Sequence, residues 1–246
     1  MTQHYENYTT GDFEVWKILF HRQMNNLQGK VADAFLDALK KIGFSEEKIP
    51  DFEEIKKRLA PLTGWSLKVV PNISPQKEFF MALSQKQFTA TCWLRKKSQL
   101  DYIEEPDMFH DVFGHVPLLT DKNYTAFFKG ISEIALENIE NEKIIEALGR
   151  LYWFTIEFGL MEENGKIKIY GAGIISSSGE TENCLSEHVQ RQDFDVKTIM
   201  NTSFRNDMIQ NNYFVIRSFE QLYRSLPEIR KIVEEMKKEK KEKLFL

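Results

Sequence analysis

The stretch PDMFHDVFGHVPLL, residues 106–119, holds two of the five histidines of the chain within six positions. Its neighbours are apolar, apart from Asp107 and Asp111. An imidazole in an apolar setting is costly to protonate, and when neutral it still requires a partner. A bound metal satisfies both rings, because neutral imidazole is a good ligand for borderline metals. The stretch therefore predicts a metal site at His110 and His115.

The spacing of the two histidines needs a local explanation. Residues five apart lie about 140° from one another around a regular α-helix. Gly114 stands between them and Pro117 follows, so we expect His110 on a helix that bends at Gly114, with His115 at or just past its end. On spacing alone, one buried and one exposed histidine explain the pair equally well.

A second stretch, LYWFTIEFGL at residues 151–160, places one carboxylate in an apolar and aromatic run. A buried carboxylate normally finds a cation, a metal or a proton. The alternative is a glutamate on the wet face of an amphipathic helix, but the neighbours of Glu157 leave little room for such a face. Two histidines and one carboxylate form the ligand set of non-haem Fe(II) oxygenases. Zinc hydrolases use the same ligand types, so this set leaves the metal open.

Apolar residues recur at helical or alternating spacing along most of the chain. The pattern predicts helices over residues 13–20, 31–39, 51–59, 79–83, 122–139 and 141–158. Extended segments are expected over residues 65–70, 88–95 and 166–175. Asp12 is the expected first cap and Gly43 the expected end of the second helix. Strands and helices do not alternate regularly and no glycine-rich nucleotide motif is present, so we expect a mostly α fold with a small β component.

Composition indicates a globular enzyme-sized chain. The 246 residues are 42% hydrophobic, carry a formal net charge of -4 and include 19 Phe. This composition and length suit a single domain over residues 1–246. Residues 1–10 and about 228–246 are expected to be flexible or charged ends. No clustered basic face suggests nucleic acid. No signal peptide or membrane-length apolar run is seen, so a cytoplasmic location is expected. Cys92 and Cys184 are expected to be buried thiols.

Three segments together resemble one known family. Residues 106–119, 153–160 and 170–180 are similar, in order and spacing, to the iron-binding segments and the following loop of the pterin-dependent aromatic amino acid hydroxylases. The similarity runs from about Val70 to Glu180. Within the family, the short length and residues 100–106 are most similar to bacterial members that hydroxylate phenylalanine. The resemblance implies the single-domain catalytic fold of the family, without a regulatory domain.

The resemblance implies a role for each matching residue. It implies His110, His115 and Glu157 as catalytic iron ligands. Arg95 would bind the substrate carboxylate, because a guanidinium offers a planar fork of donors. The other implied substrate-side residues are Asp107, which holds that arginine, Ser176 near the iron histidine, and the aromatic-pocket residues Pro106, Trp153 and Phe158. The implied cofactor-side residues are Phe79, which stacks on the pterin, Asp111 and Tyr152.

Simpler interpretations exist for several of these residues. Arg95 precedes Lys96 and Lys97, which is also the pattern of a basic loop. Phe79 and Trp153 are also explained as core aromatics, and Ser176 as a turn cap. Two positions depart from the family: Ile103 stands where animal members often have a small polar residue, and Thr89 replaces a histidine near the pterin. These departures affect details of substrate and cofactor contact.

The function implied by the resemblance is hydroxylation of L-phenylalanine to L-tyrosine with Fe(II), O₂ and a tetrahydropterin cosubstrate. A tryptophan or tyrosine hydroxylase of the same family is the nearest alternative. A zinc hydrolase with the same ligands, or a non-catalytic helical binding module, is the alternative from another class. The expected partner is the small amino acid alone, without nucleic acid or membrane, and the chain is expected to be a monomer, with a dimer as the alternative.

Overall fold

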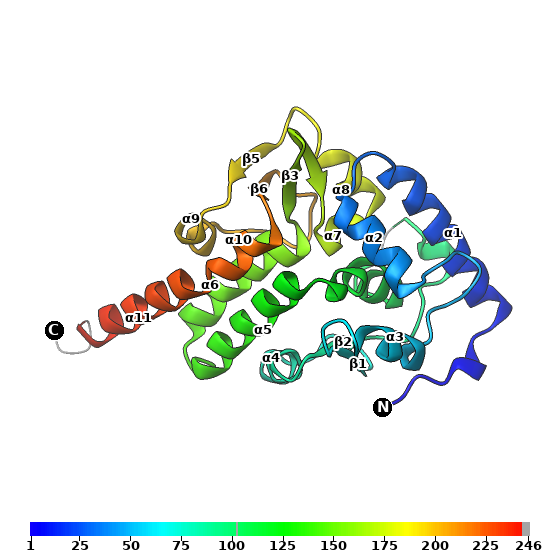
Figure 1. Cartoon of the computed structure of the whole chain (residues 1–246), viewed down its shortest axis with the longest axis horizontal. Helices are drawn as coiled ribbons and strands as arrows, with labels where there is room; N and C mark the ends of the chain where they lie inside the picture. Colours follow the sequence, from blue (N-terminus) through cyan, green and yellow to red (C-terminus); the bar gives the residue numbers. More distant parts are fainter. Residues whose placement is uncertain (102, 243–246) are drawn as a thin grey trace.

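The computed structural model describes residues 1–101 and 103–242 and is mostly helical (Figure 1). The longer helices are α1 (Thr10–Leu27), α2 (Asp33–Ile42), α3 (Phe52–Leu59), α4 (Gln76–Ser84), α5 (Lys122–Glu137), α6 (Glu142–Tyr152) and α11 (Leu226–Glu242). Short helices are α7 (Ala172–Ile175), α8 (Ser178–Asn183), α9 (Val196–Asn201) and α10 (Phe219–Arg224). The remaining helical turns are η1 (Tyr5–Asn7), η2 (Lys97–Gln99), η3 (Phe109–His115), η4 (Pro117–Thr120) and η5 (Trp153–Glu157).

The strands form two small sheets. They are β1 (Ser66–Val69), β2 (Gln87–Ala90), β3 (Leu160–Glu163), β4 (Lys166–Ile169), β5 (Gln190–Asp193) and β6 (Asn212–Ile216). β1 and β2 pair in parallel, and the second sheet has the order β4-β3-β6-β5. Only the β3–β4 pair is antiparallel there, while β6 is parallel to both of its neighbours. This architecture confirms the expected mostly α fold with a small β component.

The ends of the first two helices follow local rules. α1 is capped by Thr9, whose hydroxyl accepts from the Asp12 amide at 3.3 Å while Asp12 Oδ2 accepts from the Thr9 amide at 2.7 Å. Asp12 was expected to be the cap itself, and this is wrong, because it completes a reciprocal capping box from the third helical position. α2 ends at Gly43, which adopts φ +71° as expected.

Two extended segments are shorter than their sequence pattern indicates. The strand expected over residues 88–95 is paired only in β2, and the one expected over residues 166–175 ends at Ile169. The chain then turns into α7. Gly171 donates to the Gly159 carbonyl at 2.9 Å, and a Cβ at Gly171 would lie 2.4 Å from the Glu157 carbonyl oxygen. This close backbone contact with another segment ends the strand, and no local pattern announces it.

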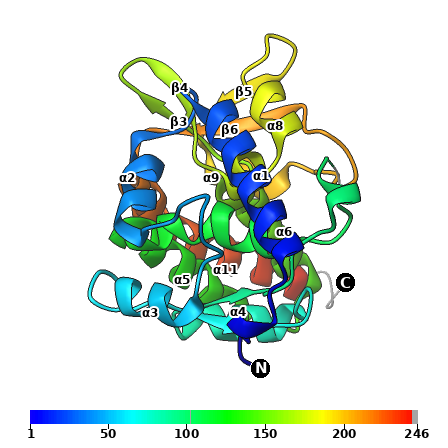
Figure 2. The ribbon, with the colours of Figure 1, turned by 90° about the vertical axis from the view of Figure 1, so that its right-hand side faces the viewer.

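The two sheets lie at opposite ends of the helical body. In Figure 1 the strands β3, β5 and β6 lie at the top, β1 and β2 lie at the bottom beside α3 and α4, and α5 and α6 cross between them. Figure 2 shows α1 running from the lower level up to the larger sheet. Buried aliphatic and aromatic side chains form one hydrophobic cluster that extends from α1 to α11. The two sheets and the helices between them therefore share one hydrophobic core.

The N-terminal residues are tied to the body, which differs from the flexible segment expected at residues 1–10. The Tyr5 hydroxyl donates to the Ile49 carbonyl at 2.9 Å, and the Tyr8 hydroxyl donates to the Cys92 carbonyl at 2.6 Å. Such contacts between distant segments cannot be inferred from a short polar sequence. Tyr102, in the segment 100–106 that resembles the family, lies outside the described residues.

The charged C-terminal segment is helical as far as residue 242. α11 buries Ile229 and Val233 near its start and extends away from the body in Figure 1. Residues 243–246 of the tail predicted at about 228–246 lie outside the described residues. Within residues 1–101 and 103–242, no helix combines the length and apolar character that crossing a membrane requires.

Candidate active site

Three side chains from two separate segments converge between the layers. His115 Nε2 lies 3.2 Å from Glu157 Oε1, and His110 Nε2 lies 3.7 Å from Glu157 Oε2. The two histidine Nε2 atoms are 3.4 Å apart. One ligand atom from each residue lies within 4.8 Å of the others, which is a suitable spacing around a single ion. The predicted ligand set is thus brought together in space.

A π-helix explains how histidines five positions apart face the same point. Residues Phe109–His115 form η3, a π-helix whose hydrogen bonds join residues five apart. Its turn is wider than that of an α-helix, so His110 and His115 come onto one side. η3 ends at His115, as expected, and its π-helical turn, in place of the expected bend at Gly114, brings the two histidines together. Glu157 ends a second π-helix, η5, in which the Phe158 amide donates to the Trp153 carbonyl at 2.8 Å.

A hydrogen-bonded serine sets the tautomer of His110. The Ser176 hydroxyl donates its proton to the Ala172 carbonyl at 2.8 Å. Its oxygen lies 2.8 Å from His110 Nδ1 and must therefore accept from that nitrogen. Nε2 of His110 is left with its lone pair, directed toward Glu157. Phe88 supports the other ligand, with its ring 4.8 Å from the ring of His115.

The electrostatics favour a bound cation. Burial lowers the pKa of His110 to about 4, so this imidazole is neutral near pH 7. Burial alone would raise the pKa of Glu157, but the two histidines and the Tyr152 hydroxyl outweigh it and lower that pKa to about 2. Neutral imidazole nitrogens and a carboxylate are the donors that bind Fe(II) or Zn(II). The residues present therefore fit a divalent transition-metal ion.

Gly114 is required by packing beside the site. A Cβ at this position would lie 2.9 Å from the Ala172 carbonyl oxygen, the same atom that accepts from Ser176. We expect Gly114→Ala to lower the free energy of unfolding by about 1–3 kcal/mol, the usual cost of overpacking. Urea titration of the metal-free protein measures this change.

Gly149 supplies the matched control for this substitution. It lies inside α6, and a Cβ there meets nothing within 4 Å. Gly149→Ala is expected to raise the free energy of unfolding by about 0.5–1 kcal/mol, because alanine is favoured over glycine inside a helix. Equal stability of the Gly114 variant and the wild type would show that the α7 backbone moves away without cost.

A buried ion pair leads from the metal site to Arg95. Asp107 Oδ2 accepts from Arg95 Nε at 2.9 Å, and Oδ1 accepts from Nη2 at 2.8 Å. The arginine side chain is 7% exposed and the aspartate 0% exposed. Asp107 Oδ1 also accepts from the His110 amide at 3.2 Å. Asp107 thus links the guanidinium to the first turn of η3, and this leaves Nη1 as the nitrogen that Asp107 does not engage.

A cavity of about 290 Å³ opens onto the ligand set. His110, His115 and Glu157 form part of its wall together with predicted cofactor-side residues. The complete lining is Val70, Asn72, Ile73, Ser74, Gln76, Phe79, Phe80, Phe88, Thr89, Thr91, Pro106, His110, Asp111, His115, Gly149, Tyr152 and Glu157. Its size and its apolar wall with few polar groups suit a small organic ligand beside a metal.

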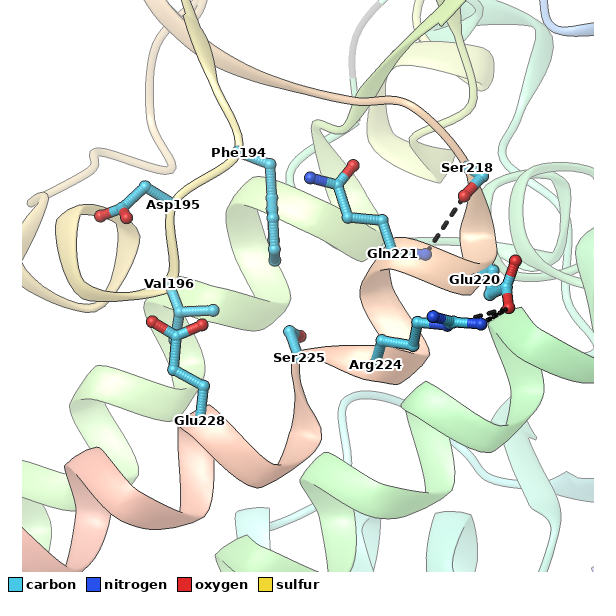
Figure 3. Close-up of a pocket in the computed structure, with 9 residues that line it drawn as sticks. All are labelled: Phe194, Asp195, Val196, Ser218, Glu220, Gln221, Arg224, Ser225 and Glu228. Carbon is cyan, nitrogen blue, oxygen red and sulfur yellow. Dashed lines mark hydrogen bonds and ion pairs between the residues drawn. The ribbon is translucent and has the colours of Figure 1, made fainter.

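Another hollow, between the β5–α9 turn and the start of α11, has a different character. Figure 3 shows mostly polar side chains along it: Arg224 pairs with Glu220, and the Ser218 hydroxyl accepts from the backbone amide of Gln221. None of the predicted site residues lies on its wall. The cavity at the histidines is therefore the candidate active site.

Comparison with known proteins places this site in a family. The family described as biopterin-dependent aromatic amino acid hydroxylase matches residues 4–243. The chain belongs to this family. It is 41% identical to phenylalanine-4-hydroxylase of Ralstonia nicotianae over 224 residues, which are 91% of this chain and 71% of that protein. It is 39% identical to phenylalanine-4-hydroxylase of Chromobacterium violaceum over 91% of this chain and 75% of that protein.

The fold comparison agrees with the sequence comparison. The crystal structure of Chromobacterium violaceum phenylalanine hydroxylase with bound oxidised Fe(III) matches this hydroxylase with a TM-score of 0.89 at 38% identity. The match covers 92% of this chain and 82% of that one. The recognition of the family from three sequence segments is thereby confirmed, together with its catalytic fold.

The residues predicted for this hydroxylase fall into two groups around the ligand set. Phe79, Asp111, Tyr152 and Pro106 line the cavity. The cavity lining, in the described part of the chain, does not include Arg95, Asp107, Trp153, Phe158 or Ser176. Asp107 and Ser176 are hydrogen-bonded to His110, and Arg95 is bonded to Asp107. Trp153 and Phe158 belong to the turn that carries Glu157. Pro106 was expected on the substrate side, whereas the structure places it on the cavity wall beside the cofactor-side residues.

Sequence reasoning missed several residues at the hydroxylase site. Thr91 donates to Asp111 Oδ2 from both its amide, at 2.8 Å, and its hydroxyl, at 2.9 Å. Burial raises the pKa of Asp111 to about 7. Phe88 against His115 and Phe204 against Trp153 are also part of the surroundings. A threonine and two phenylalanines in a phenylalanine-rich chain carry no local signal for these roles.

Proposed function

We propose that this hydroxylase converts L-phenylalanine to L-tyrosine, using Fe(II) held by His110, His115 and Glu157, a tetrahydropterin cosubstrate and O₂. The observation that carries the proposal is the convergence of these three ligand atoms within 4.8 Å on the wall of an apolar cavity. The relatives in Ralstonia nicotianae and Chromobacterium violaceum support phenylalanine as the substrate. Iron and pterin supply the activation of O₂ when they are bound, because side chains cannot perform it.

The ligand residues are held ready for the metal before it binds. Ser176 keeps His110 in the tautomer with a free Nε2, and the neighbouring histidines keep Glu157 ionised. Little reorganisation of these two ligands is then needed on binding, because His110 and Glu157 already have the protonation states that a metal requires. Three protein ligands leave further coordination positions open for O₂ or water, as in other oxygenases with this ligand set.

Arg95 is proposed to bind the carboxylate of the amino acid. Asp107 holds the Nε–Nη2 edge of the guanidinium, so the remaining donors are fixed in direction before the substrate arrives. The aromatic ring of the substrate is proposed to lie against Trp153 and Phe158, whose ring centroids are 4.5 Å apart. In the sequence, these two residues lie on either side of Glu157. Anchoring the charged end of the substrate then directs the ring toward the ligand set.

The pterin is proposed to occupy the cavity beside Phe79. This ring packs edge-on against Tyr152 at 5.7 Å, so its orientation is defined by a neighbour. A flat heterocycle stacked on Phe79 would lie within the same cavity as the ligand set, which the electron transfer to O₂ requires. Asp111, held by Thr91, offers a carboxyl group on the same wall.

Reconstitution tests the proposed function directly. The metal-free protein is loaded with Fe(II) without oxygen and then given tetrahydropterin, O₂ and one of phenylalanine, tyrosine or tryptophan. We expect tyrosine from phenylalanine in step with pterin oxidation, and no turnover after loading with Zn(II). Hydroxylation of tryptophan or tyrosine in preference to phenylalanine would overturn the proposed substrate. Consumption of neither O₂ nor pterin would overturn the proposed reaction.

A further inference from the structure

One side of Trp153 is covered by a segment distant in the sequence. The segment of residues 202–211 follows α9 and brings the ring of Phe204 against the indole, with centroids 4.3 Å apart and planes 13° from parallel. Phe158 packs on the same indole at 4.5 Å. Phe204 is 37% exposed, so the stack reaches the surface. Trp153 is thus held between its own π-helix and residues 202–211.

The Gln210 side chain links this segment to the indole, and both of its polar atoms are hydrogen-bonded. Oε1 accepts from Trp153 Nε1 at 3.2 Å. Nε2 donates to the carbonyls of Arg205 at 2.7 Å and Met208 at 2.8 Å. The two carbonyl partners require the amide nitrogen on their side, so the oxygen must face the indole N–H. The side chain is therefore fully satisfied in one orientation only.

The backbone of Gln210 is anchored as firmly as its side chain. Its amide donates to Glu180 Oε1 at 2.8 Å, and its carbonyl accepts from Asn183 Nδ2 at 2.6 Å. The Tyr213 hydroxyl donates to Glu180 Oε2 at 2.6 Å and closes the network. Gln210 and Glu180 are both buried, with 7% and 5% exposure. This network connects α8 to residues 202–211, so the hydrogen bond to Trp153 starts from a rigid support.

We propose that Gln210 is a positioning residue for the amino acid substrate: it fixes the plane of the Trp153 indole and so shapes the aromatic wall of the substrate pocket. The proposal rests on the function proposed for Trp153 and extends it to a residue 57 positions away in the chain. Rotation of the indole about its Cβ–Cγ bond turns the plane of the ring and moves Nε1. Stacking alone permits small changes of this plane, whereas a directed N–H bond to Gln210 opposes them.

A double-mutant cycle on Gln210 and Trp153 tests the proposal with phenylalanine as the probe. Gln210→Leu in the Fe(II)-loaded enzyme is expected to raise the dissociation constant for phenylalanine, measured anaerobically by calorimetry, by roughly fivefold to tenfold, about the worth of one neutral hydrogen bond. Trp153→Phe keeps an aromatic ring but removes the N–H donor. In that background, Gln210→Leu is expected to change the dissociation constant by less than about twofold.

Two controls separate positioning from general loss of structure. Gln192→Leu removes another amide whose Nε2 donates to Asn212 Oδ1 at 2.9 Å within the sheet, and it is expected to leave phenylalanine binding unchanged. Affinity for tetrahydropterin is expected to stay unchanged in all variants. An equal loss of phenylalanine affinity in both Trp153 backgrounds would overturn the proposal, because Gln210 would then act without the indole N–H.

A spectroscopic readout is independent of the substrate. The near-ultraviolet circular dichroism band of Trp153, identified as the difference between wild type and Trp153→Phe, is expected to weaken in Gln210→Leu. An unchanged band would overturn the positioning role even if hydroxylation were intact. The band could also weaken in Gln210→Leu while the wild-type protein fails to hydroxylate phenylalanine. Gln210 would then still restrain the indole, but its substrate role and the proposed function would both be overturned.

Discussion

Glu157→Ala is expected to abolish hydroxylation and to weaken Fe(II) binding by more than about 100-fold. Mutating a residue that only hydrogen-bonds to a metal ligand typically costs up to about 100-fold in affinity, and loss of a ligand itself should cost more. The carboxylate is the single anionic ligand of the set, and its Oε1 and Oε2 lie 3.2 Å and 3.7 Å from the two histidine nitrogens. Removing it leaves two neutral ligands. Iron content after anaerobic loading and desalting, with tyrosine formation on the same samples, measures both losses.

The Glu157 result needs a control for charge and for folding. Glu162 is an exposed residue on β3, and Glu162→Ala removes the same charge without touching the site. It is expected to bind iron as the wild type does. Far-ultraviolet circular dichroism is expected to be unchanged in both variants. Full iron content and turnover in Glu157→Ala would show that the assigned ligand set is wrong.

Arg95→Ala is expected to damage both substrate binding and stability. Loss of the guanidinium removes the proposed carboxylate anchor and leaves the buried Asp107 side chain without its cationic partner. Breaking a buried pair from one side typically costs about 3–5 kcal/mol. We expect a rise in the KM for phenylalanine of at least about 100-fold, since charge-assisted bidentate bonds are the stronger kind, and a parallel loss of stability in urea.

A second variant separates the two effects of Arg95. Arg95→Met with Asp107→Asn removes both charges, and the single asparagine carbonyl replaces only one of the two carboxylate oxygens that accept from the backbone amides of residue 95 and His110. Its free energy of unfolding is expected to recover part of the loss, because no buried charge remains but one backbone amide loses its acceptor. Its KM for phenylalanine is expected to stay high. Recovery of phenylalanine binding along with stability would show that Arg95 supports the fold alone.

The sequence contained enough local information for the ligands and for most helices. His110, His115 and Glu157 stand out because ionisable residues are rare in apolar runs, and that rarity is visible without a structure. Helix boundaries such as Gly43 follow from backbone preferences of single residues. The spacing of the histidines was visible too, but its explanation was not. A π-turn is rare, so a bend at Gly114 was the reasonable explanation for a helix that ends at His115.

For the residues on the substrate side, too, the sequence shows part of the arrangement and the structure shows the rest. Arg95 and Asp107 lie only twelve positions apart, yet their pairing depends on how β2 and η3 meet. A charged pair of this kind is one of many that the composition allows. The resemblance to the hydroxylase family suggested it, and only the tertiary structure shows that Asp107 also accepts from the amide of His110.

By itself, the sequence determined which side chains are candidates for the chemistry and in which order they occur, because unusual residue types in apolar surroundings are a local property. The tertiary structure alone decided what holds them: the π-helical turns, the Ser176 tautomer lock, and the bond from Trp153 to Gln210. The physical reason is that hydrogen bonds are short and directional. A partner 57 or 66 residues away is selected by the packing of whole elements, and no local pattern records that choice.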